Sequence, residues 1–349
     1  MALRHDNCTH RIAAALLGIF LLAGCGTPGG RRTPPAADLV WPPPPAPPRI
    51  RFIDAIGSPQ DVGARRSLLD LLIGQRRTER LSTPVAMAVN SQGAILVADL
   101  SGFIAMIDTE SRRFFVQHKA PGEASLISPV SVVVGPGDSL FVVDSRNNAI
   151  FIYDPKLKPV RLFAEGFDRP AGLVRDPKTG DYFVADAGAA TIKRLSNGGE
   201  LLGQIGGFGD NPDQLNTPTH IALSGDTLIV TDAYHFRIAR YLTDGTFLDG
   251  FGKVGQVPGS FARPKGVTVD RAGNIYVVDA LFGNVQIFDP NGSLLLFFGG
   301  THGNEAGSFN LPNGILIDSE NRIYVADTYH GRIQRFQVLT PAVGTGGQQ

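Results

Sequence analysis

Three histidines in the second half of the chain could together form a metal site. His220 stands two residues after a proline that opens an apolar run, while His235 and His330 each stand three residues after an aspartate. Imidazole is a common zinc ligand, but zinc needs three or four ligands within about 2 Å of the ion. The spacing does not show that His330 can reach the other two. His220 is therefore the one weak metal candidate, for zinc or calcium, and we expect no cofactor.

Six aspartates stand at equivalent positions along the chain and could be mistaken for catalytic carboxylates. They are Asp99, Asp144, Asp186, Asp232, Asp279 and Asp327. Because the same position is acidic each time, we interpret these residues as turn-capping residues rather than carboxylate pairs. The chain also has no CxxC pair, CxxCH haem site, GxSxG elbow, P-loop or HExxH motif, so we assign no catalytic residue.

The elements that position these residues come from an internal repeat. Successive aspartates lie 45, 42, 46, 47 and 48 residues apart, and a proline opens an apolar run 14 to 16 residues before each of them. These prolines are Pro84, Pro129, Pro170, Pro218, Pro264 and Pro312. Repeats of roughly 40–50 residues are typical of the blades of a β-propeller.

The fifth repeat shows how one repeat forms one blade. Residues 266–270 and 274–279 alternate apolar and polar side chains around a short polar turn, and residues 284–288 and 294–298 continue the pattern. Four antiparallel strands of about five residues each make a blade, and a blade buries its faces only against its neighbours. We therefore expect an all-β fold, a six-bladed propeller of four-stranded antiparallel blades over residues 49–340.

The sixth repeat lacks a fourth strand, because Phe336 is soon followed by Pro341 and a Gly-rich tail. An unassigned apolar segment, residues 50–57, precedes the first repeat and ends in glycine like the other fourth strands. We expect this N-terminal strand to complete the sixth blade and close the ring without an open sheet edge.

The last three repeats resemble NHL repeats, whose pattern reads roughly P-x-G-V-A-V-D, G-N-I-Y-V-A-D, then N-R-I-Q-x-F. Residues 312–318, 321–327 and 331–336 carry the resemblance most clearly, and it covers residues 84–338 with the closing strand. The single tryptophan, Trp41, lies outside the repeats, which disfavours WD40 blades. Some NHL propellers bind RNA, but a formal net charge of +0 and the expected export argue against nucleic acid here.

In such a blade the loop after the second strand lies on the same rim as the connection between blades. Its second and third residues are aromatic or histidine-bearing in blades four to six, and small or polar in the others. Exposed aromatic residues on rigid loops are a common form of partner site. The candidate interaction face is Arg146, Tyr234, His235, Phe282, Tyr329 and His330. The alternative interpretation is that these rings fill gaps between blades.

The first 24 residues are typical of an export signal, with two arginines before an apolar stretch too short to span a bilayer. Residues 22–25, Leu-Ala-Gly-Cys, resemble the bacterial lipobox, in which the signal is removed before a lipidated cysteine. The resemblance implies lipid attachment at Cys25. Gly26 follows instead of the aspartate of an inner-membrane retention signal, so we expect a bacterial outer-membrane lipoprotein, facing the periplasm or the cell surface.

Three further segments fit no repeat. Residues 25–48 are proline-rich and predict an extended tether. Residues 65–79 predict a helical insertion that starts at Ser67, with basic flanks, and residues 341–349 predict a flexible tail.

These features together predict a membrane-anchored, exported propeller that binds a protein of the cell envelope or an extracellular ligand as a scaffold. The alternative is a propeller-fold lyase or lactone hydrolase with a metal in the central funnel, because a fold shared by both classes cannot decide between them. The third residue of each repeat, counting the proline as the first, helps to choose between a binding protein and an enzyme. Only His220 among these six positions is a metal-ligand type, which favours binding over catalysis.

Overall fold

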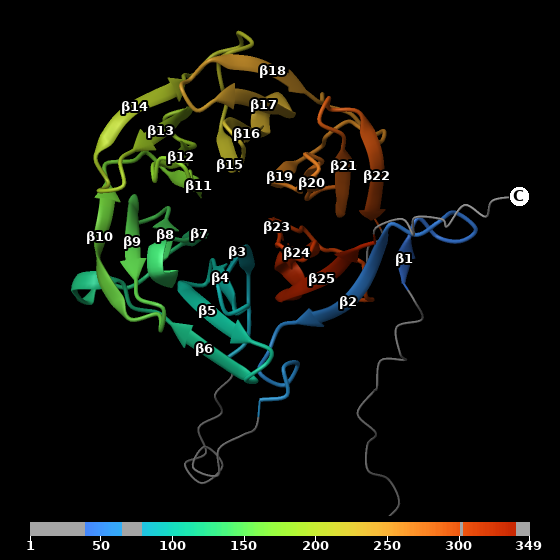
Figure 1. The fold of residues 1–349 in the computed structure, drawn as a ribbon, viewed down its shortest axis with the longest axis horizontal. Helices are drawn as coiled ribbons and strands as arrows, with labels where there is room; N and C mark the ends of the chain where they lie inside the picture. Colours follow the sequence, from blue (N-terminus) through green and yellow to red (C-terminus); the bar gives the residue numbers. More distant parts are fainter. Residues whose placement is uncertain (1–38, 65–78, 301–302, 340–349) are drawn as a thin grey trace, which may run out of the picture. The chain divides into compact units, whose positions relative to one another are not determined.

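Six antiparallel sheets surround a central axis in the computed structural model, which describes residues 39–64, 79–300 and 303–339 (Figure 1). The expected signal segment with Cys25, nearly all of the expected insertion 65–79 and the tail 341–349 lie outside these residues. All six sheets belong to one compact unit within residues 38–349. The prediction of an all-β, six-bladed propeller is confirmed.

Each of blades one to five has four strands that run in sequence order from the axis to the perimeter, as Figure 1 shows. The innermost strands of the six blades are β3 (Pro84–Val89), β7 (Pro129–Val134), β11 (Pro170–Arg175), β15 (Pro218–Ser224), β19 (Pro264–Val269) and β23 (Ile315–Ile317). The second strands are β4 (Ile95–Asp99), β8 (Leu140–Asp144), β12 (Tyr182–Asp186), β16 (Thr227–Asp232), β20 (Ile275–Asp279) and β24 (Arg322–Asp327). A repeat proline therefore starts the inner strand in blades one to five.

The third and fourth strands complete the blades. The third strands are β5 (Phe103–Asp108), β9 (Ala149–Tyr153), β13 (Thr191–Leu195), β17 (Arg237–Leu242), β21 (Asn284–Phe288) and β25 (Arg332–Val338). The outer strands of blades one to five are β6 (Arg113–Gln117), β10 (Pro159–Glu165), β14 (Leu201–Gly206), β18 (Phe247–Phe251) and β22 (Leu294–Gly299). Four 3-10 turns, η1 (Pro121–Glu123), η2 (Pro136–Asp138), η3 (Ala233–His235) and η4 (Thr328–His330), lie in loops. In the described residues no helix is long and apolar enough to cross a membrane.

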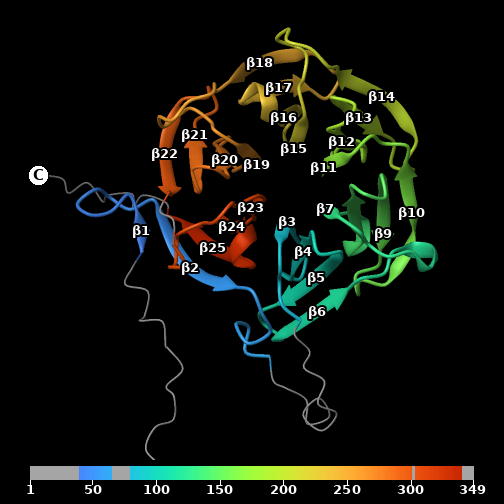
Figure 2. The same ribbon diagram turned by 180° about the vertical axis from the view of Figure 1, so that it is seen from behind.

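The sixth blade is closed by β2 (Ile50–Ile56), which pairs antiparallel with β25 from the other end of the chain. Their register places Phe52 opposite Phe336, and the two rings pack edge to face at 5.6 Å. Figure 2 views the ring from behind and shows β2 beside β25 in this one sheet. The predicted closure by the N-terminal strand is confirmed.

The expected tether does not extend to residue 48. A fifth strand, β1 (Val40–Trp41), pairs with the start of β2 in the sixth blade. The Trp41 ring packs 5.7 Å from Phe298 and 5.8 Å from Phe336. The prediction of an unpacked spacer over residues 25–48 is therefore wrong for residues 40 and 41, because an indole ring gains more from the apolar surface between two blades than from water.

The core lies between neighbouring blades rather than inside any one of them. Blades two and three, for example, bury a cluster that contains Phe141, Phe163 and Tyr182, whose ring centroids lie within 5.0 Å of one another. The connections between blades contribute as well, since Phe261 and Phe309 are fully buried. Because every blade is half of two such interfaces, the ring holds its loops in fixed positions.

Candidate functional site

The six recurring aspartates are fully buried, and they tie the connection between blades to the loop after the second strand. In blade one, Asp99 Oδ2 accepts the backbone N–H groups of Ser82 at 2.8 Å and Thr83 at 3.0 Å. The other oxygen, Oδ1, accepts the N–H of Ser101 at 3.0 Å. Asp144 and Asp279 accept backbone N–H groups in the same way. The turn-capping interpretation is confirmed, and these loops and connections form what we call the aspartate rim.

Blades four and six carry the same short motif on this rim. Residues 232–237 and 327–332 both read Asp-x-Tyr-His-x-Arg, and each tyrosine lies in a 3-10 turn, η3 or η4. Each turn ends in a left-handed residue, Phe236 at φ 54° and Gly331 at φ 61°. Because the same residue types recur two blades apart, the two turns present their tyrosines in the same local setting.

The histidine and arginine side chains of each motif bind the buried aspartate that precedes the turn. His235 Nδ1 donates to Asp232 Oδ2 at 2.6 Å, and Arg237 Nε donates to the same oxygen at 3.0 Å. In blade six, His330 Nδ1 and Arg332 Nε both donate to the equivalent aspartate oxygen at 2.8 Å. The His235 and His330 side chains are only 19% and 13% exposed. Both histidines therefore support the rim instead of forming its exposed surface.

The two tyrosines of the motif are instead strongly exposed. Tyr234 is 66% and Tyr329 is 68% exposed, so neither ring fills a gap between blades. Blade five lies between them and exposes Leu281 at 57%, while the neighbouring Phe282 is only partly exposed. Phe282 therefore contributes less surface than expected, and Leu281 takes its place. Arg146 is exposed, but it lies in the loop between β8 and β9 of blade two. Blade two stands across the ring from blade five (Figure 1), so the structure does not bring Arg146 to the others.

Exposed large apolar side chains fall in two places within the described residues. One set lies on the outer strands, such as Phe115 and Phe297, and the other lies on the aspartate rim. The rim set is Leu100, Ile127, Phe208, Tyr234, Val254, Val257, Leu281 and Tyr329. None lies in the described loops at the opposite end of the blades. The aspartate rim is therefore the more apolar of the two ends, and blade four to blade six and their connections supply most of it.

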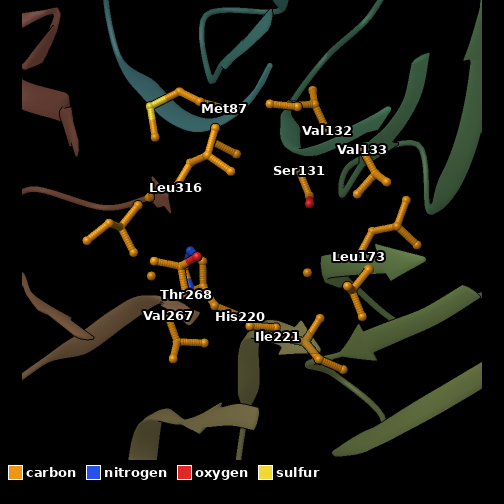
Figure 3. A pocket seen from close by; sticks show the side chains of 18 of the residues that line it. Met87, Ser131, Val132, Val133, Leu173, His220, Ile221, Val267, Thr268 and Leu316 are labelled. Atoms are coloured by element: carbon orange, nitrogen blue, oxygen red, sulfur yellow. The ribbon is translucent and has the colours of Figure 1, made fainter. Parts of the chain in front are cut away.

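The inner strands enclose a central channel of about 330 Å³ (Figure 3). Its walls are mainly apolar, with Met87, Val132, Leu173 and Leu316 among the lining side chains. His220 is the one titratable side chain among the lining residues. A channel of this size, with few polar groups, lies at the lower end of the range for small-molecule sites.

His220 reaches across blade five to blade six. Its Nε2 lies 2.9 Å from Asn313 Oδ1, and its Nδ1 lies 3.2 Å from Thr219 Oγ1. Burial and the nearby positive charge of Lys265 lower the pKa of His220 to about 3. A neutral imidazole that donates from Nε2 to the amide oxygen and accepts the threonine hydroxyl at Nδ1 satisfies both contacts.

The histidines do not form the metal site considered from the sequence. His220 contacts Asn313, while His235 and His330 bond to the aspartates of their own blades. Across residues 39–64, 79–300 and 303–339, no group of three or more His, Cys, Asp or Glu side chains could hold a metal ion. The three side chains therefore have different partners.

Sequence reasoning missed a second difference between the two halves of the ring. The residue after the repeat proline is apolar in blades one to three: Val85, Val130 and Ala171. In blades four to six it is polar: Thr219, Lys265 and Asn313. These residues lie near the start of the inner strands, and Asn313 precedes β23 by two residues. They lie at the end of the channel that the aspartate rim surrounds, because the repeat prolines of blades one to five pair with the aspartates. The polar residue that follows the proline in repeats four to six was the sequence signal that could have revealed this difference.

Comparison with known proteins supports the repeat and the fold. Residues 309–336 match the NHL repeat. Over 151 residues the chain is 31% identical to Protein brain tumor of Drosophila melanogaster, covering 42% of this chain and 14% of that protein. Over 122 residues it is 31% identical to the human E3 ubiquitin-protein ligase NHLRC1, covering 34% of this chain and 29% of that protein. The chain thus spans less than a third of either relative.

Solved structures share the fold at low sequence identity. A Bacteroides thetaiotaomicron protein of unknown function aligns with a TM-score of 0.64 and 16% identity, over 83% of this chain and 76% of that one. An auxiliary nutrient binding protein from the same organism aligns at 0.59 and 15%, over 73% and 69%. A virginiamycin B lyase of Staphylococcus aureus aligns at 0.56 and 13%, over 75% and 97%. At these identities the likeness shows a common architecture, which serves both binding proteins and an enzyme.

Proposed function

We propose that this propeller is a binding scaffold, exported and held at a membrane by lipid on Cys25, whose partner docks on the aspartate rim of blades four to six. The observation that carries the proposal is the pair of exposed tyrosines, Tyr234 and Tyr329, each fixed by the same buried Asp-His-Arg arrangement. A large ring on a rigid turn contributes contact area with little loss of conformational entropy on binding.

The proposed partner is a protein of the cell envelope or an extracellular ligand. The structural neighbours include auxiliary nutrient binding proteins, which supports a binding role. The apolar side chains of the aspartate rim support the same role, because monomeric proteins rarely expose clustered apolar surface without a partner. The bacterial outer membrane is the location that the Cys25 segment favours.

Partner capture from envelope extracts tests the proposal. The double variant Tyr234→Ala/Tyr329→Ala should capture at least ten times less of the partner, because truncation of an interface aromatic often costs about 2 kcal/mol. Its melting temperature should stay close to that of the parent, since both rings are mainly exposed.

The matched control is Phe115→Ala/Phe297→Ala, which removes two aromatic rings that are 42% and 43% exposed on the outer strands. This control should capture the partner as well as the parent does. If the control loses capture while the tyrosine variant retains it, the binding face is the perimeter of the ring and the proposal is wrong.

A further inference from the structure

Lys265 immediately precedes Gly266, which lines the central channel, and it has no counter-ion among the residues that the structure describes. The backbone of Lys265 is held from both sides, since its carbonyl accepts the Thr231 hydroxyl at 2.7 Å and the next N–H, of Gly266, donates to Asn313 O at 2.9 Å. The Lys265 side chain forms no ion pair or hydrogen bond with any residue that the structure describes. Its backbone is thus fixed, while its ammonium group has no partner in the described part of the chain.

The surroundings of this ammonium group are unfavourable for a lone cation. Burial, and then the positive charge of Arg263, lower the pKa of Lys265. Arg263 is exposed on the aspartate rim, and its guanidinium also has no carboxylate partner among the described residues. No acidic residue lines the channel, and the recurring carboxylate of the same blade, Asp279, is buried against backbone N–H groups. An added anion would offset both the cost of burying the Lys265 charge and its repulsion by Arg263.

Neighbouring blades supply polar groups beside Lys265. His220 extends from blade four and Asn313 from blade six, and they meet at 2.9 Å. Because Asn313 uses its amide oxygen in this contact, its Nδ2 group is left to donate to a ligand. Gly266 contributes no side chain at this level, and an added Cβ would lie 2.5 Å from Asn313 O. The mouth therefore combines one cation with neutral donors, and its walls lead into the apolar channel.

We propose that the channel mouth binds a carboxylate, with the charged group on Lys265 and the apolar body of the ligand inside the channel. Lys265 is the one partly buried cation here, because Arg263 beside it is exposed to solvent, and a single such charge matches a monoanion better than a dianionic phosphate or a nucleic-acid backbone. The cavity of about 330 Å³ limits the apolar body to a short chain such as that of octanoate. The site does not depend on the exposed tyrosines, so it stands or falls separately from partner capture.

Titration calorimetry with sodium octanoate and with 1-octanol tests this site. Octanoate should bind at least ten times more tightly than octanol, which has the same chain without the charge. Lys265→Met keeps the apolar stem and should weaken octanoate binding at least tenfold, while Lys265→Arg should retain most of it. Lys253→Met, which removes an exposed lysine from the connection before blade five, is the control and should bind like the parent.

Three results would overturn the proposal: no octanoate binding, equal binding of octanol, or unchanged binding by Lys265→Met. Displacement of octanoate by an equal concentration of inorganic phosphate, or tighter binding of single-stranded RNA, would also overturn it, because the site would then be a general anion site. Melting curves of all three variants verify that they fold.

The source of the carboxylate follows from partner capture with Lys265→Met. If capture falls and octanoate competes with the partner, the carboxylate is an acidic side chain of that partner. If capture is unchanged while octanoate binding is lost, the ligand is a free organic acid. Loss of capture by the tyrosine variant alone would support the rim interface and leave the channel mouth as a separate site.

Discussion

His220 Nε2 lies 2.9 Å from Asn313 Oδ1, although 93 residues separate the two in the chain. The contact joins blade four to blade six across the mouth of the channel, passing blade five at Gly266. It places the one titratable side chain of the channel lining within a network that also includes Thr219 and lies near Lys265.

Acidification should destabilise the protein partly through His220. The folded-state pKa of about 3 lies below the ordinary value of 6.5, so the unfolded chain takes up a proton that the folded chain does not. This contribution to stability is complete above about pH 6.5 and decreases as the pH falls toward about 3, by at most about 1.4 kcal/mol per pH unit. His220→Gln should therefore lose less stability than the parent between about pH 6.5 and pH 4 in urea denaturation. Equal losses would show that the imidazole is protonated in the folded state.

Gly314→Ala should lower stability by about 1–3 kcal/mol. An added Cβ at Gly314 would lie 2.3 Å from the carbonyl oxygen of Val85 on the inner strand of blade one, so a strand must move. Gly203→Ala on the outer strand β14 is the control, because nothing lies within 4 Å of its Cβ position. Thermal denaturation should find Gly203→Ala unchanged or slightly more stable. A tolerated Gly314→Ala would show that the inner strands can separate without cost.

Asp327→Ala should destabilise the sixth blade by about 3 kcal/mol or more. Its buried carboxylate accepts the Asn310 N–H at 2.8 Å and also accepts His330 Nδ1–H and Arg332 Nε–H, and these N–H groups would lose this acceptor. Asp226→Ala removes the partner of an exposed ion pair and should leave the melting temperature close to that of the parent. Similar melting temperatures for the two variants would contradict the role of the buried aspartates.

Trp41→Ala should cost about 2–3 kcal/mol, because its ring packs against Phe298 and Phe336 between two blades. Ile53→Ala, on the outward side of β2 and 40% exposed, should have little effect. Urea denaturation compares the two variants with the parent. If Trp41→Ala were as stable as Ile53→Ala, residues 40 and 41 would belong to the tether after all.

Cys25→Ala should release the protein from membranes without changing its melting temperature. Cys25 lies outside the described residues, and the propeller unit begins at residue 38. Membrane fractionation with mass spectrometry of the mature N-terminus measures the result. Cleavage at another residue, or an unmodified Cys25, would disprove the lipid anchor.

Much of the architecture follows from residue spacing. The six aspartates predict six blades and end all six second strands, and the predicted strand 284–288 matches β21 without a shift. The lack of a fourth strand after Phe336 predicts that residues 50–57 close the ring. The strand at Trp41 was not predicted, because two residues beside a run of prolines are too few to show the alternating pattern of a strand. Only the contacts with Phe298 and Phe336 make these residues part of the blade.

The sequence by itself determined the ring, the order of its blades and the end of the ring on which the candidate residues lie, because a repeat places equivalent residues at equivalent positions. Only the tertiary structure decided what each side chain does there. Tyr234 is exposed while His235, its neighbour, bonds to a buried aspartate, and His220 meets Asn313 two blades away. Such contacts join residues far apart in the chain, and their distances are set by how the blades pack and not by any spacing within one repeat.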